Sequence, residues 1–168
     1  RYNDDDPKLK ISDYAEYLKA LIFAVKAKAE EHGLNQPYLL IEPGRSIVGE
    51  AGVTLYTVGA IKDITGIKKY VAVDGGMFDN PRYALYQSKY TVLIANRADE
   101  EKTEKVTIAG KCCESGDLIA VDVPLPEAET GDILAVLTTG AYNYSMASNY
   151  NRNFICLLYT SDAADDMQ

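Results

Sequence analysis

The run Glu42-Pro43-Gly44-Arg45 combines residue types that could bind a charged, phosphorylated cofactor. The Glu42 carboxylate could pair with a protonated heteroaromatic nitrogen. Gly44 could let the backbone approach a phosphate closely, and the Arg45 guanidinium could donate a fork of hydrogen bonds to it. Pyridoxal phosphate carries both groups, and its pyridinium nitrogen needs an anionic partner if the ring is to act as an electron sink. A surface salt bridge at a strand end would produce the same run, so these residues leave both interpretations open.

A second segment, 74–86, could supply groups that bind a carboxylate. Arg82 and Tyr86 are four residues apart, so on a helical turn they would share one face and could converge on the same carboxylate. The alternative is a hairpin or wide loop whose Arg is simply solvated.

Two further loops carry candidate groups. In Cys112-Cys113-Glu114, between two predicted strands, one thiol could deliver a proton to a carbanion while the carboxylate binds an ammonium. Tyr142, in the run 140–142, could donate its hydroxyl hydrogen to a phosphate. Each of these residues could equally be a structural part of its loop.

The predicted secondary structure that positions these residues changes near residue 50, from a helix and a buried strand to a series of short strands. Apolar residues at helical spacing predict a helix from about 13 to 32, with Ser12 as its N-cap and Gly33 ending it. The apolar run 37–42 predicts a buried strand of the parallel type that ends at Glu42. The apolar face of the helix is expected to be Tyr14, Tyr17, Leu18, Leu21, Ile22 and Val25.

From residue 53 onward the sequence predicts an antiparallel sheet or barrel. Short β-rich runs alternate with Gly, Pro, Asn and Asp, and no long helical pattern intervenes. The predicted strands are 53–58, 70–73, 90–94, 105–108, 118–121 and 133–137.

Composition excludes several classes of function. A formal net charge of -8 is unfavourable for a nucleic-acid-binding surface. No apolar run is long enough to predict a membrane span. Three cysteines and one histidine form neither a disulfide framework nor a metal-site pattern, so no metal is expected and a reducing cytoplasm is the predicted location.

Taken together, the motifs resemble those of the diaminopimelate decarboxylases, pyridoxal-phosphate enzymes of the alanine-racemase-like fold. The likeness covers about residues 1–152. It is carried by the motifs EPGRSIV, DGGM-x-DNPR, CCESGD and GAY followed by SMASNYN, in this order.

The resemblance implies an α/β-plus-β fold in which the end of a cofactor-binding (β/α)8 barrel is followed by an antiparallel β-barrel-like domain. The barrel part would be 1–50, and the C-terminal domain 51–155. Residues 156–168 are expected to be non-native, because Cys156 to Asp165 resembles a translated transposon-type sequencing adapter. The cofactor-binding Lys and the Gly-rich phosphate loop of the family are expected upstream of Arg1, so the fragment alone should be inactive.

The resemblance also implies roles for the candidate residues. Decarboxylation of meso-2,6-diaminopimelate would yield L-lysine and CO2, with Cys113 as the proton donor. The protein would be a homodimer in which the Cys113 loop completes the partner's site. The cofactor would bind Glu42, Pro43, Gly44, Arg45 and Tyr142, and the unreacting end of the substrate would bind Arg45, Arg82, Tyr86, Glu114 and Tyr142.

The sequence leaves two alternatives open. One is a related decarboxylase that acts on ornithine, arginine or carboxynorspermidine, against which Glu114, Arg82 and Tyr86 argue. The other is a non-catalytic β-domain that serves as a binding module.

Overall fold

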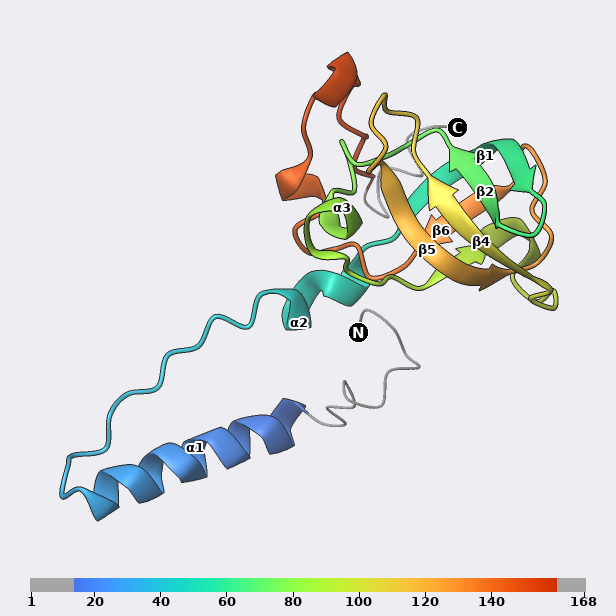
Figure 1. Cartoon of the computed structure of the whole chain (residues 1–168). Coiled ribbons are helices and arrows are strands. Elements are labelled where there is room, and N and C mark those ends of the chain that lie inside the picture. Colours follow the sequence, from blue (N-terminus) through green and yellow to red (C-terminus); the bar gives the residue numbers. More distant parts are fainter. Residues whose placement is uncertain (1–13, 160–168) are drawn as a thin grey trace.

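The computed structural model describes residues 14–159 of the chain (Figure 1). Within this range the predicted helix is confirmed as α1 (Tyr14–Glu31). It ends as predicted at Gly33, whose φ of 62° lies in the left-handed region. The N–H of Gly33 donates to the carbonyl of Glu30 (3.1 Å), and the N–H of Leu34 donates to that of Ala29 (2.8 Å). These two bonds form a Schellman motif, which glycine favours because it has no Cβ. The proposed N-cap Ser12 lies outside the described residues.

The expected apolar face of α1 is only partly buried. Leu18, Leu21 and Val25 are half-buried, whereas Tyr14, Tyr17 and Ile22 are exposed. Figure 1 shows α1 standing apart from the sheet. The prediction of a fully buried face was therefore wrong for this part of the chain, because helical spacing shows which residues share a face and not what covers it.

The predicted strand at 37–42 is absent. Residues 34–43 form no helix or strand, and they lead into the short α2 (Arg45–Val48) and the 3₁₀ turn Gly49–Ala51. A strand exists only through hydrogen bonds to a neighbouring strand. No strand among the described residues pairs with this segment.

The six predicted strands are confirmed, and they form one sheet in the order β3-β6-β1-β2-β4-β5. Their bounds are β1 (Thr54–Ile64), β2 (Lys68–Val73), β3 (Val92–Ile94), β4 (Glu104–Ala109), β5 (Leu118–Leu125) and β6 (Ile133–Val136). The two outermost strands of this order, β3 and β5, also contact each other, so the sheet curls into a nearly closed barrel (Figure 1).

The sheet is mixed, which corrects the prediction that it is antiparallel throughout. β2 and β4 run parallel, with Lys69 opposite Val106 and Val71 opposite Ile108. The connection between them contains α3 (Arg82–Tyr86) and β3, and is long enough to return the chain in the same direction. All other strand pairs in the described part of the chain are antiparallel.

The inside of the barrel is a single apolar core. Alternate residues of the strands point inward, as the period-2 pattern requires. The fully buried side chains include Val58, Val71, Ile94, Val106, Ile108, Ile119, Leu125, Leu134 and Val136. This core holds the strand ends in place, and the candidate residues lie on the loops that leave them.

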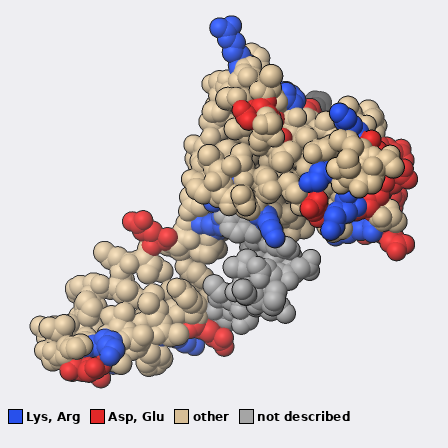
Figure 2. Space-filling model, in the orientation of Figure 1, with Lys and Arg blue, Asp and Glu red and all other residues tan. Residues whose placement is uncertain are grey.

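Charged side chains of both signs are mixed on the visible face of the molecule, where Lys and Arg side chains lie among Asp and Glu side chains (Figure 2). Among the described residues, no helix combines the length and the apolar character needed to cross a membrane.

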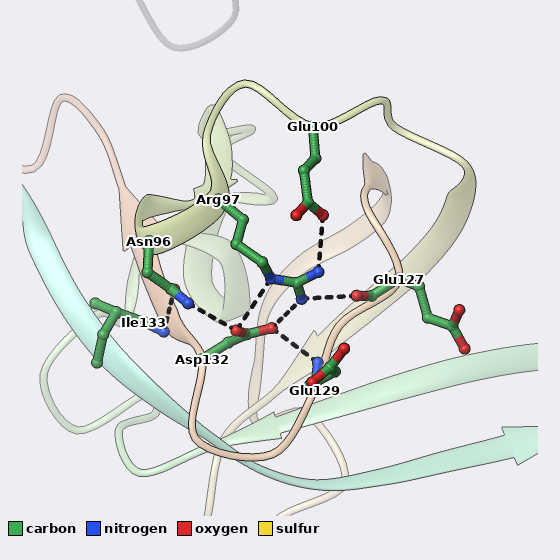
Figure 3. Close-up of polar contacts among 7 residues, drawn as sticks. All are labelled: Asn96, Arg97, Glu100, Glu127, Glu129, Asp132 and Ile133. Carbon is green, nitrogen blue, oxygen red and sulfur yellow. Dashed lines mark hydrogen bonds and ion pairs between the residues drawn. The ribbon is translucent and has the colours of Figure 1, made fainter.

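A buried carboxylate in an ion pair fastens the start of β6 (Figure 3). The Arg97 guanidinium donates to the Asp132 carboxylate at 2.5 Å, and Asn96 Nδ2 and the N–H of Glu129 donate to it at 2.9 and 2.8 Å. Burial alone would raise the pKa of Asp132, but the hydrogen bonds from Arg97, Asn96 and Glu129 outweigh it and lower the pKa to about 2.

Replacing Asp132 with Asn is expected to destabilise the sheet domain by about 1–3 kcal/mol at pH 7, because charge-assisted hydrogen bonds are lost in a buried site. A carboxyl group whose pKa is lower in the folded than in the unfolded protein stabilises the fold at every pH above its unfolded pKa. This stabilisation disappears as the pH falls through the pKa of the folded state. The free energies of unfolding of wild type and variant should therefore differ at neutral pH and converge between about pH 4 and pH 2. Urea denaturation of the full-length protein, followed by circular dichroism across this range, measures the difference. A difference independent of pH would contradict the assignment to the carboxylate.

Candidate active site

Two arginines face the ring of one tyrosine at the edge of the barrel. The Cζ of Arg45 lies 5.2 Å from the centroid of the Tyr142 ring, and the Cζ of Arg82 lies 5.5 Å from it. Arg82 also covers the ring of Tyr86, at 4.4 Å. Cation–π contacts of this length are favourable, and they orient both guanidiniums. We call Gly44, Arg45, Arg82, Tyr86 and Tyr142 the arginine–tyrosine cluster.

Each arginine is held by its own element. Arg82 and Tyr86 are the first and last residues of α3, which confirms that they share one helical turn. Arg45 begins α2, and its guanidinium donates to the carbonyls of Thr138 (3.4 Å) and Ala141 (3.2 Å). The loop after β6 is thereby tied to the start of α2.

Tyr142 is held in a conformation that L residues rarely adopt. Its φ is 71°, in the left-handed region. The carbonyl of Tyr142 accepts from the N–H of Met146 (3.0 Å), and the adjacent, buried Asn143 accepts from the hydroxyl of Tyr90 (3.1 Å). Backbone strain of this kind persists where surrounding contacts impose it, and it is frequent at functional sites.

Gly44 makes room for the Tyr142 hydroxyl. Its φ is 50°, and a Cβ on Gly44 would overlap the Tyr142 hydroxyl oxygen. A side chain is thus excluded twice at this position, by the backbone conformation and by space. Pro43 accepts from the N–H of Ser46 (3.2 Å), while Glu42 lies exposed on the segment that precedes α2.

Cys113 and Glu114 lie on a different loop, between β4 and β5. The N–H of Cys113 donates to Asn151 Oδ1 at 2.8 Å, and the Glu114 carboxylate accepts from the N–H of Gly116 at 3.1 Å. Both Cys113 and Glu114 are exposed. We call residues 110–116 the Cys–Glu loop.

The two adjacent thiols differ in environment. Cys113 is exposed, whereas Cys112 is half-buried, and burial, together with the charge and hydrogen bonding of Asp117, raises the pKa of Cys112 to about 11. Cys112 is therefore held as a neutral thiol, and Cys113 is the more accessible of the two.

The structure adds residues that the sequence motifs did not assign. Tyr150 lies near Glu114, and burial followed by the Glu114 charge raises the pKa of the Tyr150 hydroxyl. Asn151 and Asn153 contact the two cysteines, and the buried Asp117 hydrogen-bonds to the loop backbone. The only sequence signal for Tyr150 and Asn151 was the run SMASNYN, and Asn153 lies just beyond it. Nothing in the spacing placed this run beside Cys113.

The chemistry of the arginine–tyrosine cluster suits phosphates and carboxylates. Two guanidiniums, a phenol hydroxyl and a glycine that admits close approach are the groups with which proteins bind such anions. The described residues contain no group of three or more His, Cys, Asp or Glu side chains that could hold a metal ion.

Comparison with known proteins gives one consistent family. Residues 9–140 match the family model described as pyridoxal-dependent decarboxylase, C-terminal sheet domain. The chain is 56% identical over 152 residues to a diaminopimelate decarboxylase of Bacillus subtilis, covering 90% of this chain and 34% of that protein. It is 57% identical over 136 residues to that of Staphylococcus aureus, covering 80% and 32%. The chain thus spans about a third of the length of these relatives.

A solved structure agrees with these sequence matches. The diaminopimelate decarboxylase of M. jannaschii, in co-complex with L-lysine, superposes with a TM-score of 0.68 at 39% identity. The match covers 80% of this chain and 30% of the other.

Proposed function

This chain belongs to the pyridoxal-dependent decarboxylase family, and from that premise we propose that it is part of a diaminopimelate decarboxylase, which converts meso-2,6-diaminopimelate to L-lysine and CO2. The observation that carries the proposal is the arginine–tyrosine cluster, in which Arg45 and Arg82 face one ring from two distant segments. A substrate with an amino-acid group at each end needs such a site for the carboxylate that does not react.

Pyridoxal phosphate fits the residues of this cluster. Gly44, Arg45 and Tyr142 would hold its phosphate, since the Tyr142 hydroxyl lies against Gly44 and Arg45 lies over the same ring. Glu42, next to Pro43, would pair with the pyridinium nitrogen. When bound, the cofactor supplies an electron sink for the electron pair left behind by the departing carboxylate.

The unreacting end of the substrate would be bound by charge. Arg82, with Arg45, Tyr86 and Tyr142, would bind its carboxylate, and Glu114 would bind its ammonium. A substrate whose far end is only an amine would bring no anionic group to Arg82. Binding such a substrate would desolvate the Arg82 charge without a compensating anion, which lowers the affinity for it. The charge of Arg82 therefore favours diaminopimelate over ornithine.

Cys113 would then protonate the reacting carbon. A general acid must be able to reach the substrate and must carry a proton to give, and the exposed thiol of Cys113 meets the first requirement, whereas the half-buried Cys112 does not. We propose that the Cys–Glu loop acts on the site of a second subunit, in a homodimer.

The same proposal assigns the parts of the chain. Residues 1–50 would belong to the cofactor-binding barrel and 51–155 to the C-terminal β-domain. Residues 156–168 would be non-native; Cys156 to Tyr159 are exposed, and 160–168 lie outside the described residues.

The function is tested with the full-length protein that contains this sequence. Purified protein with added pyridoxal phosphate is assayed for CO2 release from meso-diaminopimelate, ornithine, arginine and carboxynorspermidine. We expect L-lysine from diaminopimelate at a kcat/KM well above that for the other three. Faster turnover of a substrate without a distal carboxylate would assign the protein to a different decarboxylase, and no turnover of any of them would favour a binding module.

Replacing Tyr142 with Phe should weaken binding of pyridoxal phosphate by about tenfold, because one hydrogen bond to a charged phosphate is lost while the ring stays. The full-length variant is titrated with cofactor and followed by cofactor absorbance. Tyr144→Phe is the matched control, since Tyr144 is exposed two residues further on. Equal affinities in the two variants would remove the Tyr142 hydroxyl from the cofactor site.

A further inference from the structure

Asp117 is a buried carboxylate that the proposed chemistry does not use. The residue is 3% exposed. Its two oxygens accept from two backbone N–H groups, those of Met77 (2.5 Å) and Cys112 (2.7 Å). Met77 and Cys112 belong to different loops, so a single side chain joins the segment that leads to Arg82 to the Cys–Glu loop.

The topology explains why these loops meet. β2, β4 and β5 are neighbours in the sheet, with β2 parallel to β4 and β5 antiparallel to it. The ends of β2 and β4 and the start of β5 therefore lie at the same edge. Asp117 directly precedes β5, and the two loops leave β2 and β4 beside it.

Two glycines leave space for this carboxylate. A Cβ on Gly76 would come within 2.7 Å of Asp117 Oδ2, and a Cβ on Gly110 would lie closer still. Backbone hydrogen bonds complete the junction, from Gly110 to the carbonyl of Asp117 (2.9 Å) and from Lys111 to that of Gly75 (3.0 Å). The side chain is thus confined by the backbone on both sides.

We infer that Asp117 is a positioning residue, which holds the Cys–Glu loop so that Cys113 and Glu114 meet the substrate in one arrangement. The anchored N–H is that of Cys112, the residue directly before Cys113. The role rests on the proposed function, since it concerns the acid and the ammonium-binding group assigned there. Asp117 itself touches no reacting atom.

A second effect of the carboxylate concerns which thiol can react. Burial and then the Asp117 charge raise the pKa of Cys112 to about 11, so at pH 8 about one Cys112 in a thousand is a thiolate. Asp117 thus holds the loop, and it adds to the larger effect of burial in keeping the neighbouring Cys112 thiol neutral.

The test is Asp117→Asn in the full-length protein. The Asn amide offers one acceptor oxygen, and its NH2 would face the second backbone N–H, so the junction between the two loops loses one of the two hydrogen bonds that Asp117 accepts. We expect kcat for diaminopimelate to fall by about ten- to a hundredfold per cofactor-loaded site, with a smaller change in KM, because misplacing a reacting group mainly costs turnover. Asp132→Asn is the matched control: it removes a buried, hydrogen-bonded carboxylate elsewhere in the sheet domain, and it should lower stability while leaving kcat per loaded site unchanged.

A readout independent of activity is thiol labelling. The folded proteins are treated with iodoacetamide at pH 8, and alkylation of Cys112 and Cys113 is measured by peptide mass mapping. In wild type only Cys113 should react, and in Asp117→Asn the ratio of labelled Cys112 to labelled Cys113 should rise. If Asp117→Asn does not fold, Asp117→Ser is used, because its hydroxyl oxygen can still accept one bond.

The two proposals fail differently. Wild-type protein that does not decarboxylate diaminopimelate refutes the function, whereas the labelling ratio still tests the positioning of the loop. A variant of Asp117 with wild-type kcat per loaded site and a wild-type labelling ratio would overturn the positioning role.

Discussion

Replacing Cys113 with Ala in the full-length protein is expected to lower kcat by about 10²–10⁴, the usual contribution of a positioned general acid. KM for diaminopimelate should change much less, since in the proposed mechanism the thiol acts on the reacting carbon and other groups hold the substrate. Cofactor absorbance should be unchanged, because the residues proposed to hold pyridoxal phosphate lie in and beside the arginine–tyrosine cluster.

Cys112→Ala is the matched control for this prediction. Cys112 is half-buried with a pKa of about 11, and it should be dispensable for turnover. Equal losses in the two variants would mean that neither thiol is specifically the acid, or that loop packing rather than proton transfer is measured.

Mixing inactive subunits tests whether Cys113 acts on the partner's site. Cys113→Ala protein is refolded or exchanged with a variant that lacks the cofactor-binding Lys of the full-length protein. If the site is shared, each hybrid dimer contains one intact site and activity returns. No recovery in proven hybrids would show that each subunit supplies its own Cys113.

Replacing Arg82 with Met is expected to lower kcat/KM for diaminopimelate by about ten- to a hundredfold, because the charged hydrogen bond that we propose between Arg82 and the distal carboxylate would be lost. Met is similar in length and can still pack against the rings of Tyr86 and Tyr142, so the fold of α3 should survive. The effect should be confined to substrates that carry a distal carboxylate.

Selectivity is therefore the decisive readout for Arg82. The ratio of kcat/KM for diaminopimelate to that for lysine, which lacks the second carboxylate, is compared in wild type and in Arg82→Met. Arg152→Met is the control, since Arg152 is exposed at the end of the 3₁₀ turn Tyr150–Arg152. An unchanged ratio in Arg82→Met would remove Arg82 from substrate recognition and leave it a structural role beside Met146.

Local pattern was sufficient to predict most elements. Helical spacing with Gly33 after it located α1, and the alternating β-rich runs located all six strands. These signals depend on residues that are close in the sequence, where side-chain period and turn chemistry act directly. The same pattern was misleading at 37–42, since an apolar run becomes a strand only when a neighbouring strand pairs with it.

The site depended on contacts that no local pattern describes. The motifs named Arg45, Arg82 and Tyr142 individually, but only the folded chain brings both guanidiniums to one ring and joins Arg45 to a carbonyl 96 residues away. Asp117 ends the motif CCESGD, but the sequence assigned it no role. In the folded chain it joins two loops, because the parallel pairing of β2 with β4 places three strand ends at one edge. Residue types determine which chemical groups are available, whereas strand order and register decide which of those groups lie side by side. The pairing of distant segments depends on the packing of the whole core, which no local pattern describes.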